Sequence, residues 1–187
     1  MPQPINNALP YNLEAEQSVL GAILIDMEEQ YEIVSKLKED DFFLESHKLI
    51  FHSMSEICGS NKPVDLVTLS DDLEKKSSLE KAGGIEYVTE LARTTPSAAN
   101  YQYYLDIVKR DGTLRKLIRG AEDIIKNARV SSDRRSSVEY AEKKVYDISE
   151  ELDTSTLTNL NAEVPTILNK FENIQKDKNF FQGLKTG

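Results

Sequence analysis

Hydrophobic residues recur every three or four positions along most of the chain, which is the spacing of amphipathic α-helices. The first such series follows Asn12, a candidate N-cap, and comprises Leu20, Ile23, Leu24 and Met27. No segment alternates between apolar and polar residues as a half-buried strand does. The pattern therefore predicts an all-α protein.

Residues 12–96 are predicted to form a compact helical domain. Within it, Ser46 is a candidate cap for a helix that ends at Gly59. A glycine pair at positions 83–84 separates two further helices. The second of these is expected to end at Thr95, because the residue before a proline disfavours helical geometry.

Residues 97–152 are predicted to form an antiparallel helical hairpin. No proline interrupts this segment, and its first arm keeps the helical period with a weak point expected at Asp111-Gly112. A polar turn over residues 131–136 precedes a second arm, whose apolar residues are spaced by three and four positions as in a heptad repeat.

The apolar seam between the two arms is too narrow to build a compact body. The hairpin is therefore predicted to project from the domain and to offer one face to another chain. An alternative stays open, in which the hairpin folds back onto its own domain. The predicted residues for association or partner binding are Leu114, Leu117, Ile118, Ile124, Ile125, Val138 and Val145.

Both ends of the chain are expected to lie outside these units. Residues 1–11 hold three of the six prolines and are predicted to be a flexible leader. Residues 153–187 begin with a polar, linker-like stretch, and Pro165 then starts a separate amphipathic helix that needs another subunit to dock on. The docking residues of this linker helix are predicted to be Ile167, Leu168, Phe171 and Ile174.

Candidate chemistry is scarce. No G-x-x-x-x-G-K-[ST] loop occurs, and Lys185-Thr186 lacks the glycine-framed turn that cradles phosphate. His47 and His52 are five residues apart, which does not suit a metal pair on one helix face, so packing or capping roles are expected. Cys58 is expected in the core. These residues therefore predict no catalytic, cofactor or metal site, and no ATP hydrolysis of their own.

Charge is unevenly placed along the 187 residues, whose formal net charge is −9. Residues 1–60 carry 3 basic and 11 acidic side chains, whereas residues 101–135 carry 9 basic and 5 acidic ones. The basic hairpin either attracts an acidic protein face or a phosphate backbone, or is simply solvated, and few aromatic residues accompany it, so only weak binding of single-stranded DNA is expected. Its basic residues include Lys109, Arg110, Arg115, Lys116, Arg119 and Lys126.

Targeting signals are not evident. The N-terminus lacks a basic stretch followed by an apolar run, and no 18 consecutive residues are apolar, so neither secretion nor a membrane partner is expected. A single cysteine excludes an internal disulfide. The chain is predicted to be cytoplasmic.

Several motifs resemble the bacterial DnaB-type replicative DNA helicases. The first is LEAEQSVLGAILID at 13–26, which is similar to the opening helix of that family. The others follow in the family's order: DDFF at 40–43 with His47, PVDLVTL at 63–69, GGIEYVTEL at 83–91 and TPSAANYQYYLDIVKR at 95–110. The resemblance extends over nearly the whole chain but is weak in residues 130–163.

This resemblance implies an all-helical N-terminal collar domain plus a linker helix, with the ATP- and Mg²⁺-dependent motor domain beyond these residues. In the family, collars assemble as trimers of dimers within a hexamer and bind primase, while single-stranded DNA is held by the motor domains. Self-association, the primase C-terminal domain and a helicase loader are therefore the implied partners. The alternative is a complete small helical adaptor, such as a loader or regulator, without a motor.

Overall fold

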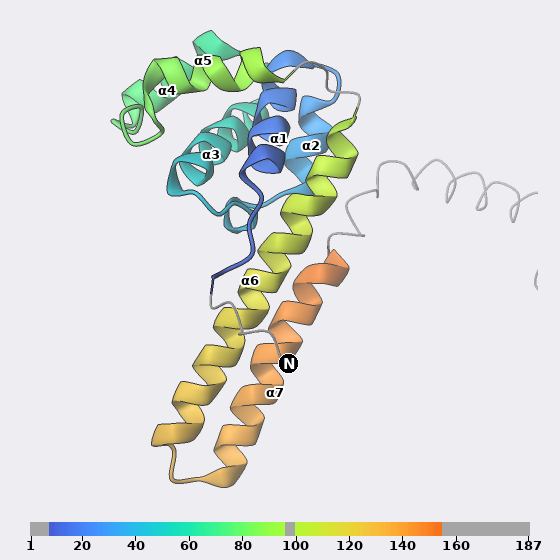
Figure 1. The fold of residues 1–187 in the computed structure, drawn as a ribbon, viewed down its shortest axis with the longest axis vertical. Helices are drawn as coiled ribbons and strands as arrows, with labels where there is room; N and C mark the ends of the chain where they lie inside the picture. Colours follow the sequence, from blue (N-terminus) through green and yellow to red (C-terminus); the bar gives the residue numbers. More distant parts are fainter. Residues whose placement is uncertain (1–7, 96–99, 155–187) are drawn as a thin grey trace, which may run out of the picture. The chain divides into compact units, whose positions relative to one another are not determined.

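The structure, a computed structural model, describes residues 8–95 and 100–154, and every regular element in these ranges is helical. The prediction of an all-α fold is confirmed. The elements in chain order (Figure 1) are α1 (Leu13–Ile25), α2 (Gln30–Lys36), the 3₁₀ helix η1 (Glu39–Asp41), α3 (Glu45–Gly59), α4 (Leu66–Lys75), α5 (Gly84–Thr94), α6 (Tyr101–Val130) and α7 (Arg134–Thr154).

Helix α1 is the centre of the body formed by α1 to α5 and the first half of α6. It packs against α2, α3, α5 and α6, and its side chains are buried on nearly every side. Val19, Leu20 and Ile23 are fully buried, together with Ile50 and Met54 of α3. Contacts group residues 1–148 into one unit and residues 149–187 into a second.

Helix starts follow the capping residues only in part. Asn12 caps α1 by accepting a hydrogen bond from the amide of Ala15, as predicted. Ser46 does not cap α3, because the carbonyl of Leu44 already accepts a helical hydrogen bond from Lys48, so the helix begins at Glu45. The predicted cap was therefore wrong: the N-cap position of α3 is Leu44, and Ser46 lies inside the first turn of the helix.

Glycines allow close helix contacts at two positions. A Cβ at Gly21 of α1 would overlap Thr95 and the carbonyl oxygen of Leu91, and one at Gly112 of α6 would lie 2.8 Å from the Cα of Asp41. Helix α6 is unbroken through Asp111 and Gly112, both of which are buried. The predicted weak point is therefore wrong: the glycine brings α6 against η1 and does not loosen the helix.

The predicted flexible leader is wrong for its last residues. The carbonyl of Pro10 accepts a hydrogen bond from Arg115 of α6 at 2.8 Å. The ring of Tyr11 stacks on Phe43 with centroids 4.4 Å apart. Residues Pro10 and Tyr11 therefore belong to the folded body, because partners distant in sequence hold them there.

Candidate interaction surface on the helical hairpin

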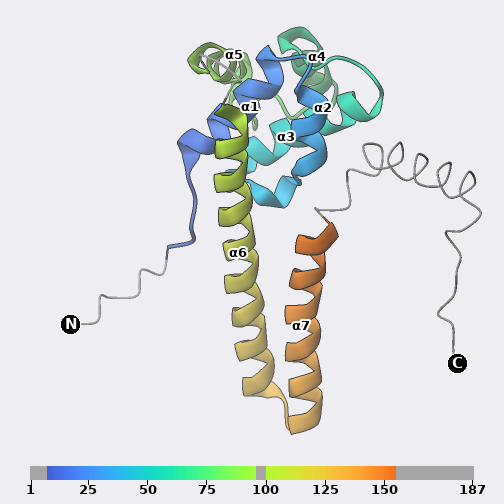
Figure 2. The same cartoon turned by 90° about the vertical axis from the view of Figure 1, so that its right-hand side faces the viewer.

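Helix α6 divides into a buried half and an exposed half. From Tyr101 to Arg115 it contributes buried side chains that pack on α1 and η1, and its last fully buried residue is Gly120. Beyond that point α6 runs past the body and faces α7 across a short turn (Figures 1 and 2). The turn is three residues long, because α7 already begins at Arg134. The hairpin is formed by α7 and by α6 from Leu114 onward, where the apolar side chains of α6 are largely exposed.

Arg115 fixes α6 where it leaves the body. Its guanidinium donates to the carbonyl of Asp41 at 2.6 Å as well as to Pro10, and it lies 5.8 Å from the centroid of the Phe43 ring. The side chain is buried, and that burial lowers its pKa. The inclusion of Arg115 among the basic residues that attract a partner is therefore wrong: its charge is used inside the fold.

Asp41 is the acidic member of this joint. Its carboxylate accepts a hydrogen bond from the amide of Lys38 at 2.8 Å, and Lys116 approaches to 4.0 Å. Burial raises the pKa of Asp41, and the hydrogen bond from Lys38 opposes that effect without cancelling it. The folded protein therefore binds a proton at Asp41 more readily than the unfolded chain does.

This difference predicts a pH dependence of stability. An acid whose folded pKa is raised stabilises the fold below its unfolded pKa, about 3.9, and that contribution is lost as pH rises through the raised value. The free energy of unfolding of the wild type, measured relative to Asp41→Asn by urea titration, should therefore fall with rising pH across this window. Asp40→Asn, at an exposed neighbouring position, is the control. A difference that stays constant with pH would contradict this role of Asp41.

The two arms of the hairpin meet through a few specific contacts. A Cβ at Gly120 would lie 2.9 Å from Cδ1 of Ile148, so the absence of a side chain there admits α7. Lys144 of α7 binds Asp123 of α6 at 3.2 Å and lies over the ring of Tyr140. These contacts hold the arms antiparallel, yet they cover little of the apolar surface.

Most of the predicted association residues are exposed. Six of them have between 37% and 55% of their surface accessible, and Ile124 is half-buried. We call these six the hairpin face: Leu114, Leu117, Ile118, Ile125, Val138 and Val145. Val130 and Tyr146, which are 84% and 64% exposed, are further exposed residues of the hairpin that the apolar spacing did not indicate. The linker-helix residues Ile167, Leu168, Phe171 and Ile174 lie outside the described residues.

A buried polar network ties α1, α3 and α5 together in the body. The Nδ1 atom of His47 lies 2.6 Å from Glu16, its Nε2 atom lies 2.6 Å from the hydroxyl of Tyr87, and Glu16 also accepts from the amide of Phe43. A carboxylate only accepts, so Nδ1 carries the proton shared with Glu16. In that tautomer Nε2 accepts from the Tyr87 hydroxyl, whose oxygen in turn accepts from the side-chain amide of Gln17. His47 therefore has the packing role expected of it.

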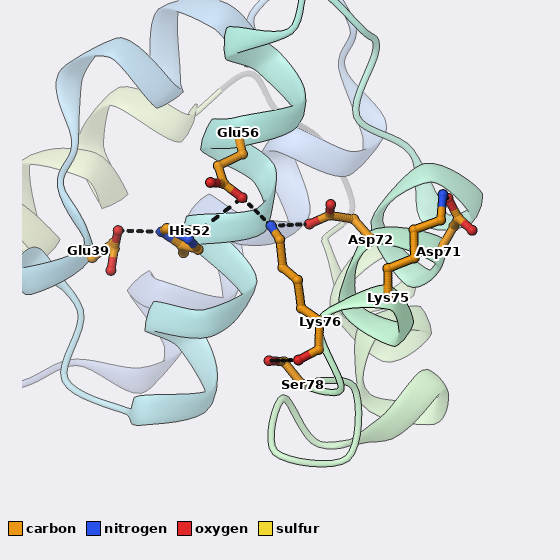
Figure 3. Close-up of polar contacts among 8 residues, drawn as sticks. All are labelled: Glu39, His52, Glu56, Asp71, Asp72, Lys75, Lys76 and Ser78. Carbon is orange, nitrogen blue, oxygen red and sulfur yellow. Dashed lines mark hydrogen bonds and ion pairs between the residues drawn. The ribbon is translucent and has the colours of Figure 1, made fainter.

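A second, exposed network joins η1, α3 and α4 (Figure 3). His52 lies between Glu39, at 2.6 Å, and Glu56, at 3.6 Å, and Lys76 binds both Glu56 and Asp72. The hydrogen bond from Lys76 lowers the pKa of Glu56. The packing or capping role predicted for His52 is therefore wrong, because its side chain is exposed and pairs with carboxylates at the surface. Within the described ranges no three His, Cys, Asp or Glu side chains are grouped as metal ligands would be.

None of the helices described here is both long enough and apolar enough to cross a membrane. Cys58 is buried, as predicted. The geometry defines an all-helical domain with a helical hairpin on which several apolar side chains are exposed. Residues 8–110 match the family described as DnaB-like helicase N terminal domain. The chain belongs to this family.

Relatives and solved structures agree with this assignment. The chain is 41% identical over 145 residues to the replicative DNA helicase DnaB of Buchnera aphidicola, covering 76% of this chain and 31% of that protein. It is 34% identical over 185 residues to the replicative DNA helicase DnaC of Bacillus subtilis, covering 98% of this chain and 41% of that protein. The chain thus spans well under half the length of these relatives.

Two solved structures share the fold. The N-terminal domain of DnaB helicase from Mycobacterium tuberculosis superposes with a TM-score of 0.71 at 29% identity, covering 75% of this chain and 99% of that one. A DnaB-like replicative helicase, described together with its interactions with primase, gives a TM-score of 0.63 at 25% identity, covering 86% of this chain and 35% of that one.

Proposed function

We propose that the chain is the N-terminal domain of a replicative DNA helicase, where it assembles the subunits into a hexameric collar and docks primase. The match of residues 8–110 to the helicase N-terminal family supports this most directly. The exposed apolar residues of the hairpin face supply the surface for association. The similar helicase described with primase supports primase as the partner.

The complete protein would be an ATP-dependent DNA helicase that acts in the bacterial cytoplasm. ATP and Mg²⁺ would be bound outside these 187 residues, because the sequence contains no G-x-x-x-x-G-K-[ST] loop to cradle the phosphates of ATP. Single-stranded DNA would be held by the motor domain, and a helicase loader is a further expected partner of the complete protein.

The hairpin face gives the direct test of the assembly role. Ile118→Asn is expected to weaken self-association or primase binding by about 10- to 150-fold, which corresponds to the roughly 1.5–3 kcal/mol gained by burying one such side chain. The melting temperature should change little, because Ile118 is 37% exposed in the single chain. Mass from light scattering, with and without the primase C-terminal domain, measures both equilibria.

Val67→Asn is the matched control, because Val67 is an exposed β-branched residue on α4, away from the hairpin face. It should leave both equilibria unchanged. The opposite order for Ile118→Asn, with the melting transition lost and association kept, would show that the hairpin face packs within one chain. The proposed docking of the linker helix on a neighbouring subunit stays a prediction, to be checked by hydrogen exchange of residues 166–176.

A further inference from the structure

Two exposed patches of opposite charge lie at opposite ends of α6. The first, the hairpin tip, comprises the last residues of α6, the turn and the start of α7. Residues 126–135 contain four basic and one acidic side chain, although the whole chain has a net charge of −9. Two of the basic residues are offset by acidic neighbours on their own helices, because Lys126 pairs with Asp123 and Arg135 with Glu139. The one acidic residue, Asp133, is occupied in capping α7, since its carboxylate accepts from the amides of Arg135 and Ser136. Val130, 84% exposed, lies among these charges.

The second patch, the acidic corner, is the turn between α1 and α2. Residues 25–32 contain four acidic and no basic side chains. Lys36 offsets one of the charges by pairing with Glu32, and Asp26 accepts from the amides of the turn. Glu28 is exposed, and so are the apolar residues of the corner. These are Ile25, Met27 and Tyr31, with 42%, 61% and 44% of their surface accessible.

The two patches cannot meet within one chain. The hydroxyl of Tyr101, the first residue of α6, donates to Glu29 at 2.9 Å, which places the corner at the N-terminal end of that helix. The tip lies at its C-terminal end, Val130. An unbroken helix of 30 residues is roughly 45 Å long, so the patches are held that far apart.

We propose that the hairpin tip of one copy of this chain docks on the acidic corner of a second copy. Charge complementarity carries the choice of partner: basic side chains around an exposed valine face acidic side chains around exposed apolar ones. Residues 105–139 contain no aromatic side chain, so the tip offers no surface on which the bases of single-stranded nucleic acid stack. Because the two patches differ, two copies can make this contact reciprocally, each tip on the other copy's corner, as in an isologous dimer. The same contact made in one direction only joins copies in series and closes a ring when the rotation permits.

This interface is separate from the apolar hairpin face of the proposed function. Charged contacts near a surface weaken as salt rises, whereas burial of the hairpin face does not depend on ion screening. A failure of the tip contact would remove only the salt-sensitive step of assembly. A failure of the hairpin face would remove the salt-insensitive step.

The test is a charge swap between copies of the chain. Arg134→Glu at the tip and Glu28→Lys at the corner each replace an attraction by a repulsion, and both side chains are exposed at positions where they hold no part of the fold together. Each variant alone should lose about five- to tenfold in the salt-sensitive association constant, measured by sedimentation velocity at about 50 mM salt. An equimolar mixture should recover association, because each mutated patch then faces the opposite charge on the other variant.

Matched controls keep the net charge change and move it elsewhere. Lys81→Glu and Glu80→Lys, both exposed before α5, should leave association unchanged singly and in mixture. Circular dichroism reports whether each variant is folded. The proposal is overturned if wild-type association is the same at about 50 and about 500 mM salt, or if the mixture behaves as the separate variants do. It is also overturned if Arg134→Glu lowers only the binding of an oligonucleotide and leaves self-association intact.

Discussion

Arg115→Ala is expected to destabilise the domain by about 3–5 kcal/mol. The substitution removes two charge-assisted hydrogen bonds, to the carbonyls of Pro10 and Asp41, each worth roughly 1.5–3 kcal/mol. It also leaves these carbonyls without their partner and removes the cation beside the Phe43 ring. The free energy of unfolding from urea titration measures the loss, and hydrogen exchange should rise in residues 8–12 and in η1.

One further variant separates the hydrogen bonds of Arg115 from its charge, and a second, at a neighbouring exposed position, is the control. Arg115→Lys keeps the charge but cannot donate in the planar fork, so it should recover only part of the stability. Arg119→Ala, one turn further along α6 at an exposed position, should change stability by less than about 0.5 kcal/mol. Equal losses for Arg115→Ala and Arg119→Ala would contradict the structural role assigned to this joint.

His47→Ala is expected to cost a similar amount, about 3–5 kcal/mol. The change leaves Glu16 and Tyr87 short of a partner in the interior and opens a cavity between α1, α3 and α5. Its effect should appear as a lower unfolding free energy with the far-ultraviolet helix signal of the native protein retained. The same measurement on Tyr87→Phe, which removes only the hydroxyl, should give a smaller loss.

The conservative replacements decide whether hydrogen bonding is responsible. In His47→Asn the introduced side-chain amide nitrogen occupies about the position of Nδ1 and can donate to Glu16. In His47→Leu the new side chain fills space but cannot donate. The Asn variant should therefore be more stable than the Leu variant. His52→Ala is the surface control, because His52 pairs with exposed carboxylates, and surface ion pairs are typically worth less than about 1 kcal/mol. Equal stability of the Asn and Leu variants would show that volume alone matters at this position.

The sequence by itself determined the all-helical fold and some of the helix ends. The spacing of the apolar residues reflects which side of each helix is buried, and this spacing can be read along the chain. The cap of α1 is equally local, because Asn12 accepts from an amide three residues away. The glycine pair before α5 and the stop at Thr95 also follow from backbone geometry local to the chain. The motifs between residues 13 and 110 were sufficient for the family, because their order and spacing are properties of the sequence.

Tertiary structure alone decided which charged residues are available to a partner. Arg115 has the same chemistry and nearly the same sequence surroundings as Arg119, yet the first is buried and the second exposed. The difference arises because the partners of Arg115 lie 74 and 105 positions away in the chain, and no periodicity reports such contacts. For the same reason Glu16 and His47 could not be paired from sequence, since a hydrogen bond between two helices depends on how those helices pack.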